Sequence, residues 1–468
     1  MRRWTLLAIC GTVLPFCLAT AGPVDAAQPE SKSEWQVGLA RVRITPRTPI
    51  PMCGYAPHLS EGVLDELYAK AMAIEHADGQ RAVLLTADLL FFRAPMAELV
   101  RKKIMEKTGL RRRQILLNAS HTHSGPVFGV EDPDRFDLPA DQRKTVDTYT
   151  QELLGQLVDI AVGALADVSP ARLSWGVGAA GDFVMNRRLM TPEGTCRGMG
   201  PNPQGPVDRD VPVLRVDSPD GQLRALLFGC ACHPVTLDGR NRKISGDYAG
   251  FAQQYVENEY PGVQAMFMIG CGGDANSHPR GGPQQEQLVR THGHRLGREV
   301  CRVAAGPLQP VHGPLKVDLR LVGLPLEHTL SREQLQKIID DRPSYWHERN
   351  ARRMLERLNR NQPLPKDYRS SVALWQFGDD LTLVGLPGEA VAEYALVLRG
   401  VLGPERLWIA AYCNESFGYL PTAKMLSEGG HETMCLTLAV GFFSPKVQEV
   451  VIDTVRQLAR KAGRRLSP

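Results

Sequence analysis

Short apolar runs alternate with longer amphipathic stretches through most of residues 35–465. Runs rich in β-branched residues and bounded by Gly, Pro or Asp predict strands, and apolar positions three or four residues apart predict helices. The predicted strands occupy residues 37–45, 67–76, 81–90, 114–118, 223–230, 381–386 and 407–412. The predicted helices occupy residues 96–107, 145–165, 248–260, 284–305 and 388–399. We therefore predict an α/β fold with mixed β-sheets flanked by helices.

The same pattern predicts one large domain over residues 35–468, because no linker, repeat or low-complexity tract interrupts it. Asp78-Gly79 between two strand-like runs predicts a hairpin turn. Residues 181–210 are dense in Gly, Pro and Arg and predict a long loop, which in a compact domain is usually functional or disordered. Ser331 to Gln334 forms a capping-box pattern that opens a charged helical segment reaching about Arg360, either a solvated hairpin or a lid.

Four of the predicted strands are followed by residues that can bind a metal ion. Ligands in open α/β sheets collect beyond the carboxyl ends of the strands, so residues far apart in the sequence can meet there. The residues in question are His121 and His123 after 114–118, His233 after 223–230, Glu389 after 381–386 and Tyr419 after 407–412. The sequence therefore predicts a metal site at the strand ends.

The His121-Thr122-His123 motif points to zinc in particular. Residues i and i+2 of a strand share a face, imidazole suits zinc, and a catalytic zinc takes three or four nitrogen or oxygen ligands and leaves a position for water. Two hydrogen-bonded loop histidines are the simpler alternative. Cys230-x-Cys232-His233 also permits a thiolate zinc site, although alternation places Cys232 opposite His233.

The motifs together resemble those of the neutral (non-lysosomal) ceramidases, zinc amidases that cleave the N-acyl bond of ceramide. The matching segments are Met52-Cys53-Gly54-Tyr55-Ala56, His121-Thr122-His123-Ser124-Gly125-Pro126, Asn186-Arg187, Asp208-Arg209-Asp210, His233-Pro234, Gly246-Asp247-Tyr248, Gly273-Asp274, Pro387-Gly388-Glu389 and Tyr419-Leu420-Pro421-Thr422. The resemblance implies the following site residues: zinc ligands at His121, His233, Glu389 and Tyr419, with His123 and Arg187 beside the metal.

Two departures from that family affect the expected substrate. Gly270-Cys271-Gly272 stands where ceramidases carry polar side chains, and the chain ends at Pro468, where full-length members continue into a β-sandwich. A site that hydrogen-bonds a substrate hydroxyl discriminates strongly, and a glycine-lined wall would give up that discrimination. We therefore expect hydrolase chemistry to be retained and ceramide not to be the best substrate.

The expected reaction is hydrolysis of an N-acyl amide by zinc-activated water, since zinc lowers the pKa of bound water to near 7. His123 would exchange protons with the leaving group, and Arg187 would add positive charge near the developing oxyanion. Asp247 and Asp274 follow glycines and fit helix caps better than catalytic groups. The alternatives are a zinc esterase or other amidase on the same scaffold, and a non-catalytic lipid- or glycan-binding relative.

The N-terminus and the composition bear on compartment and partners. Residues 1–27 combine Arg2 and Arg3, an apolar core over residues 6–18 and small residues beyond it, which predicts a secretory signal peptide and a secreted or periplasmic protein. A net charge of +4 on so long a chain argues against nucleic acid as a partner. We expect a small amphiphilic or lipid substrate and transient contact with a membrane surface. The sequence leaves the oligomeric state open.

Overall fold

The computed structural model describes residues 1, 33–130, 138–342, 345–433 and 440–466. Residues 33–468 form one compact unit with a mixed α/β fold, so the predicted fold class is confirmed. The predicted signal peptide lies outside the described residues except for Met1. Among the residues described, no helix is both long enough and apolar enough to cross a membrane.

The larger sheet has nine strands in the described chain, in the order β14-β12-β11-β8-β1-β5-β6-β7, with β16 paired to β8. Its strands are β1 (Trp35–Arg43), β5 (Tyr68–His76), β6 (Arg81–Ala87), β7 (Ile115–Ala119), β8 (Ser169–Ala179), β11 (Asp210–Asp217), β12 (Leu223–Cys230), β14 (Gln264–Ile269) and β16 (Gln309–Val311). Strands β5 and β6 form the predicted hairpin, with Gly79 at φ 84° in the turn. Both β6–β7 and β12–β14 pair in parallel.

A second, four-stranded sheet packs face to face on the first. It consists of β17 (Leu315–Pro325), β18 (Asp367–Phe377), β19 (Leu381–Gly385) and β21 (Leu407–Ala410). Alternate residues of β18, including Trp375 and Phe377, join one buried cluster with Trp35 and Met72 of the larger sheet. Because side chains alternate between the faces of a strand, the intervening residues of each sheet face outward and are covered by helices.

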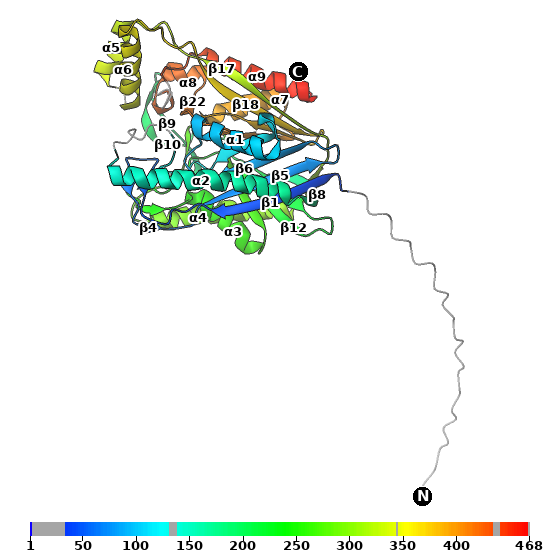
Figure 1. Ribbon diagram of the computed structural model, residues 1–468. Helices are drawn as coiled ribbons and strands as arrows, with labels where there is room; N and C mark the ends of the chain where they lie inside the picture. Colours follow the sequence, from blue (N-terminus) through cyan, green and yellow to red (C-terminus); the bar gives the residue numbers. More distant parts are fainter. Residues whose placement is uncertain (2–32, 131–137, 343–344, 434–439, 467–468) are drawn as a thin grey trace. The chain divides into compact units, whose positions relative to one another are not determined.

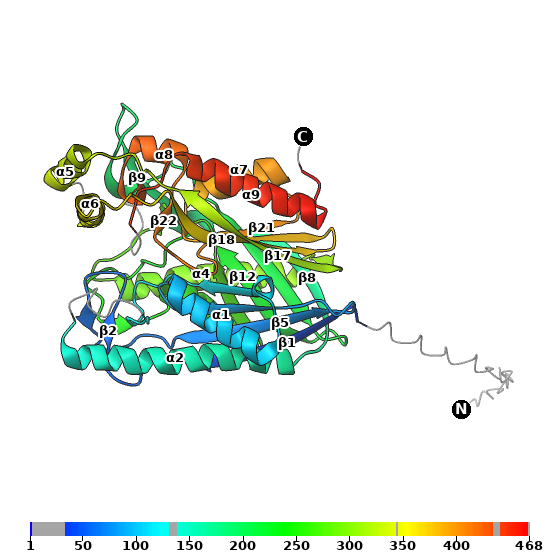
Figure 2. The same ribbon diagram turned by 45° about the horizontal axis from the view of Figure 1, so that its top comes forward.

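Helices cover both outer faces and give an α–β–β–α layering. Helices α1 (Ala94–Thr108), α2 (Ala140–Ala166), α3 (Asp247–Glu259) and α4 (Gln285–Ala305) cover the larger sheet, and α7 (Ala392–Leu402) and α9 (Lys446–Ala462) cover the smaller one. Figure 2 shows this arrangement, with α2 below β1 and β5 and α9 above β17 and β18. Helix α1 ends at Gly109, which has a left-handed φ of 70°.

Two sequence predictions about local structure were wrong. The segment predicted as a long loop contains β9 (Val184–Met190) and β10 (Cys196–Asn202), which pair antiparallel and extend to β15 (Ala275–Ser277). The glycines and the proline of β10 weakened the sequence signal for a strand. In the structure β10 pairs with β9 only irregularly. The predicted helix over residues 388–399 begins instead at Ala392, because Gly388 has φ 65° and Glu389 donates its backbone N–H to Gly418.

The charged segment after Ser331 forms two helices, as its capping box indicated. These are α5 (Arg332–Asp341) and α6 (Tyr345–Asn359), and the Ser331 hydroxyl accepts from the Gln334 backbone N–H. Figure 1 shows the pair at the periphery of the compact unit. Its role as a lid stays a prediction.

Asn118, the penultimate residue of β7, joins the carboxyl ends of strands from both sheets. Its side chain is fully buried, donates to the Ala411 carbonyl at 2.7 Å and accepts from the Ile269 N–H at 3.1 Å. Backbone bridges between Asn118 and Cys413 and between Gly270 and Ala410 reinforce the junction. The strand ends that carry the predicted ligands are therefore held together by polar contacts inside the core.

We expect Asn118→Ala to lower the free energy of unfolding by about 2–5 kcal/mol, because it leaves two buried backbone groups unpaired and each costs about 1–3 kcal/mol. Urea titration of the purified protein measures this. The exposed Asn359→Ala is the control and should change stability by less than about 0.5 kcal/mol. Equal stability of the two variants would contradict the junction role.

Candidate metal centre

Three imidazoles meet where the strands end. His121 and His123 follow β7 and His233 follows β12, and one ring nitrogen from each lies within 4.8 Å of the others. The rings of His121 and His123 come together, but not as alternate residues of a strand: β7 has already ended at Ala119, and His121 has φ 69°. A left-handed turn, rather than strand alternation, brings the pair to one site.

Each of these imidazoles is held by a backbone carbonyl at Nδ1. The distances are 2.8 Å from His121 to Leu90, 3.0 Å from His123 to Gly54 and 2.6 Å from His233 to Gly272. A carbonyl oxygen only accepts, so Nδ1 must carry the proton in all three rings. A neutral ring then presents a bare lone pair at Nε2, which is the form in which imidazole binds a metal.

These three lone pairs and one carboxylate converge. His121 Nε2 lies 3.1 Å from His123 Nε2, and Glu389 Oε2 lies 3.2 Å from His121 Nε2 and 3.1 Å from His233 Nε2. All four atoms are acceptors, so contacts this short repel unless a cation lies among them. The residues present therefore fit a metal ion.

Protons on His123 and His233 do not supply that cation at neutral pH. Burial lowers the pKa of His233 to about 3 with help from Arg187, and burial lowers the pKa of His123 well below its usual value. Burial would favour the neutral acid at Glu389, but His121 and His233 outweigh it and hold its pKa well below its usual range. The group thus combines one carboxylate with imidazole nitrogens, the donor set that zinc prefers.

Glu389 and Tyr419 are placed side by side by backbone pairing. They are opposite residues of two short parallel strands, β20 (Glu389–Ala390) and β22 (Tyr419–Leu420). Gly388 permits this because a Cβ there would lie 2.7 Å from the Phe417 ring. The Tyr419 ring stacks on that of His233, with centroids 6.2 Å apart.

Arg187, on β9, holds Tyr419 from the other side. Its Nη2 donates to Tyr419 Oη at 2.9 Å, Nη1 to Asn276 Oδ1 at 3.1 Å and Nε to Glu432 Oε1 at 2.8 Å. Burial raises the pKa of the Tyr419 phenol and Arg187 opposes that rise. Because all three guanidinium nitrogens of Arg187 donate to a partner, the group is fixed in orientation and positions the Tyr419 phenol.

Sequence reasoning missed two residues of this network. Glu432 is completely buried and accepts from both Arg187 and Arg188, the latter at 2.6 Å. Its neighbour His431 stands edge-on to the Tyr419 ring, with centroids 5.2 Å apart. The adjacent arginines 187 and 188 were the available signal, because two buried guanidiniums need an acidic partner.

Gly270, Cys271 and Gly272 pack closely against the segment that carries His233. All three are buried, and a Cβ on Gly272 would lie 2.6 Å from the Cys232 nitrogen. They allow the backbone to approach His233 closely, and the expectation that ceramide is not the best substrate stays a prediction. The thiol of Cys232 contacts the His233 carbonyl at 3.6 Å and does not belong to the imidazole group, which removes the basis for a thiolate site.

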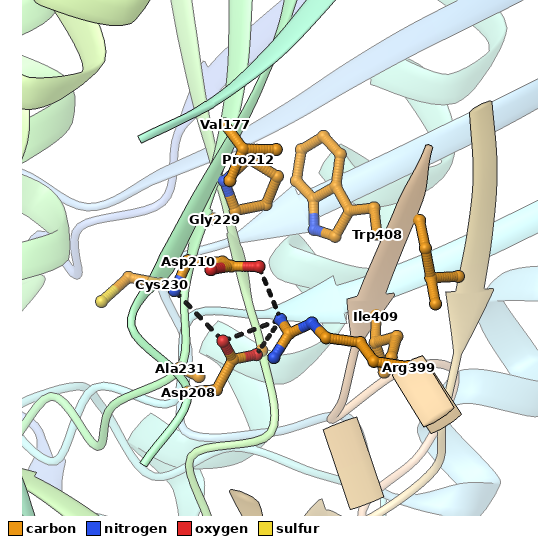
Figure 3. A pocket seen from close by; sticks show the side chains of 12 residues that line it. Val177, Asp208, Asp210, Pro212, Gly229, Cys230, Ala231, Arg399, Trp408 and Ile409 are labelled. Atoms are coloured by element: carbon orange, nitrogen blue, oxygen red, sulfur yellow. Dashed lines mark hydrogen bonds and ion pairs between the residues drawn. The ribbon is translucent and has the colours of Figure 1, made fainter. Parts of the chain in front are cut away.

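The aspartates bind backbone N–H groups and arginines, but Asp247 and Asp274 do not cap a helix that directly follows them: α3 begins at Asp247 without a side-chain cap, and Asp274 precedes β15. Asp274 accepts from the N–H of Ala392 at 2.8 Å, where α7 begins, and Asp247 accepts from the N–H of Leu237 at 2.9 Å. Asp208 and Asp210 each bind Arg399 of α7 at 2.8 Å (Figure 3). These contacts fix α7, and with it the segment that carries Glu389.

Comparison with known proteins places the chain in a family. A family model described as neutral/alkaline non-lysosomal ceramidase, N-terminal, matches residues 35–287, more than half of the chain. The chain belongs to this family. The resemblance seen in the sequence is thereby confirmed, and the family is one of hydrolases.

Individual ceramidases show how far the likeness extends. Neutral ceramidase A of Dictyostelium discoideum is 25% identical over 242 residues, which is 50% of this chain and 33% of that protein. Neutral ceramidase of Pseudomonas aeruginosa is 25% identical over 307 residues, which is 62% of this chain and 44% of that protein. The chain thus spans less than half the length of these curated relatives.

The solved structures agree in fold. The crystal structure of neutral ceramidase from Pseudomonas aeruginosa superposes with a TM-score of 0.70 and 19% identity, covering 92% of this chain and 75% of that one. A ceramidase described as complexed with C2 gives a TM-score of 0.71 with 18% identity, covering 92% and 76%. At this level of identity the likeness shows the shared fold.

We expect close to one zinc ion per chain in the purified protein. The Nε2 atoms of His121 and His233 both contact Glu389, so the three groups would share one metal ion. The His121→Ala, His233→Ala double variant removes two of these ligands and should lose the metal. Elemental analysis after dialysis measures both. The exposed His294→Ala should keep the wild-type content, and full zinc occupancy in the double variant would overturn the site.

Proposed function

We propose that this ceramidase-family protein is an exported zinc-dependent hydrolase that cleaves an N-acyl amide bond in a small amphiphilic, ceramide-like substrate. The observation that carries the proposal is the convergence of three Nε2 lone pairs and the Glu389 carboxylate within contact distance. Residues 35–468 would form the hydrolase domain and residues 1–27 the signal peptide for secretion or export to the periplasm.

The zinc would be held by His121, His233, Glu389 and Tyr419. The first three already face one another, and Tyr419 is placed beside Glu389 by backbone pairing. Bound zinc would lower the pKa of a water molecule to near 7 and polarise a carbonyl. The protein contributes buried metal ligands of fixed orientation, because the carbonyls of Leu90 and Gly272 hold the imidazoles of His121 and His233 at Nδ1.

His123 is suited to move the proton. Its Nδ1–H is fixed by the Gly54 carbonyl, its Nε2 faces the metal site, and it is only partly buried while His121 and His233 are fully buried. Nε2 would accept a proton from the attacking water and pass it to the leaving nitrogen. Because burial keeps its pKa low, this imidazole is neutral and ready to act as a base.

Arg187 supports the site by orientation and charge. Its three donor positions are directed to Tyr419, Asn276 and Glu432, so the guanidinium cannot rotate away. A fixed positive charge beside Tyr419 would stabilise the negative charge that develops on the carbonyl oxygen. Transient contact with a membrane surface would deliver the amphiphilic substrate, and no nucleic acid is involved.

The direct test is hydrolysis of a fluorescent N-acyl sphingosine compared with a simple N-acyl amide and the matched ester. The comparison also tests the expectation that ceramide is not the best substrate, which rests on Gly270 to Gly272. We expect kcat/KM for the amides to depend on zinc and to vanish after chelation. Cleavage of only the ester would favour an esterase, and binding without cleavage a non-catalytic relative.

His123→Ala should leave zinc bound and lower kcat by roughly 10²–10⁴-fold, the usual effect of losing a general acid or base. Stopped assays at saturating substrate together with metal analysis measure the two effects. His294→Ala, on the exposed face of α4, is the matched control and should retain wild-type kcat. Loss of zinc in the His123 variant would show that this residue is a ligand.

A further inference from the structure

Tyr412 has a buried phenol whose hydroxyl lacks a hydrogen-bond partner among the residues that the structure describes. The residue is 0% exposed, so bulk water does not satisfy the hydroxyl. Other buried tyrosines are paired: Tyr149 donates to the Ile44 carbonyl at 2.7 Å and Tyr248 to the Cys232 carbonyl at 2.6 Å. An unpaired buried donor is uncommon in native proteins and points to a bound group that completes it.

The Tyr412 phenol lies against the candidate metal centre. Its ring centroid is 4.6 Å from that of His121 and 6.2 Å from that of His233. The backbone N–H of Tyr412 donates to the Gly388 carbonyl at 2.9 Å, directly before Glu389. Tyr412 is therefore built into the same cluster of strand ends that carries the proposed zinc ligands.

The backbone of Tyr412 is strained, which supports a functional reason for its position. Its φ of 54° is in the left-handed region, which is unfavourable for a residue with a bulky side chain. The following N–H, of Cys413, donates to the Leu386 carbonyl at 2.9 Å and helps to fix this conformation. Strain of this kind is concentrated at functional sites, where surrounding contacts hold it.

We propose that Tyr412 is a further catalytic residue, whose Oη–H donates a hydrogen bond to the oxygen anion bound at the metal centre. The inference rests on the proposed function. When the oxygen of water adds to an amide carbonyl carbon, its proton passes to His123 Nε2, the C–O π electron pair moves onto the carbonyl oxygen, and that charge accepts the hydrogen bond. On collapse the pair re-forms the C=O bond, the C–N bond breaks, and the proton goes from His123 to the leaving nitrogen. Tyr412 keeps its proton throughout, because the hydroxyl acts only as a hydrogen-bond donor.

The test compares Tyr412→Phe with the wild-type protein, because this change keeps the ring and removes only the hydroxyl. Calorimetry of the zinc-loaded proteins measures the Kd of acetohydroxamate, a small oxygen anion that binds zinc. We expect the Kd to rise about 10- to 100-fold, the loss of one hydrogen bond to a charged group. Zinc affinity should be unchanged, and kcat should fall about 10²–10³-fold.

The Tm of the metal-free protein separates this role from a structural one. Removing an unpaired hydroxyl should leave the Tm unchanged or raise it by about 1–2 °C. Tyr149→Phe, which removes the hydrogen bond to the Ile44 carbonyl, should lower the Tm and leave the acetohydroxamate Kd unchanged.

Three results would overturn the proposal. An unchanged acetohydroxamate Kd in Tyr412→Phe would show that the hydroxyl does not contact the bound anion. A lower Tm of the metal-free variant would show that the hydroxyl binds a structural water, and weaker zinc binding would make Tyr412 a metal ligand. If the wild-type protein binds neither zinc nor acetohydroxamate, the proposed function itself fails, and the role of Tyr412 with it.

Discussion

The site depends on one electrostatic constraint: atoms that can only accept hydrogen bonds are forced together in the interior. Backbone carbonyls fix the proton of each imidazole on Nδ1, so the Nε2 lone pairs of His121, His123 and His233 face one another and Glu389. In a medium of low polarity such contacts are unfavourable without a cation. These buried acceptor atoms therefore fit a metal ion with nitrogen and oxygen ligands.

Contacts elsewhere in the fold hold the strand ends in place and so offset the repulsion among these acceptor atoms. Two sheets stack face to face, and their carboxyl ends converge at the buried Asn118, which binds backbone groups of Ile269 and Ala411. Arg399 anchors α7 to Asp208 and Asp210, and Arg187 anchors Tyr419 to Glu432. Strained backbone at His121 and Tyr412 persists because these contacts surround it.

Much of this was predictable from sequence, and the remainder has identifiable physical reasons. Apolar runs located β7, β12, β19 and β21, and the residues after them are those that meet. The hairpin of β9 and β10 was missed because its glycines and prolines resemble a loop. The roles of Glu432 and Tyr412 could not be predicted, because they depend on which donors and acceptors remain unpaired after the chain has folded.

X-ray absorption at the zinc edge of the purified protein tests the central claim most directly, because it reports the ligand atoms themselves. The account predicts a coordination shell of nitrogen and oxygen only, at about 2.0–2.2 Å, with the outer-ring scattering typical of imidazole. A sulfur shell at about 2.3 Å would assign the metal to cysteines such as Cys232. That result, or the absence of bound zinc, would contradict the proposed centre.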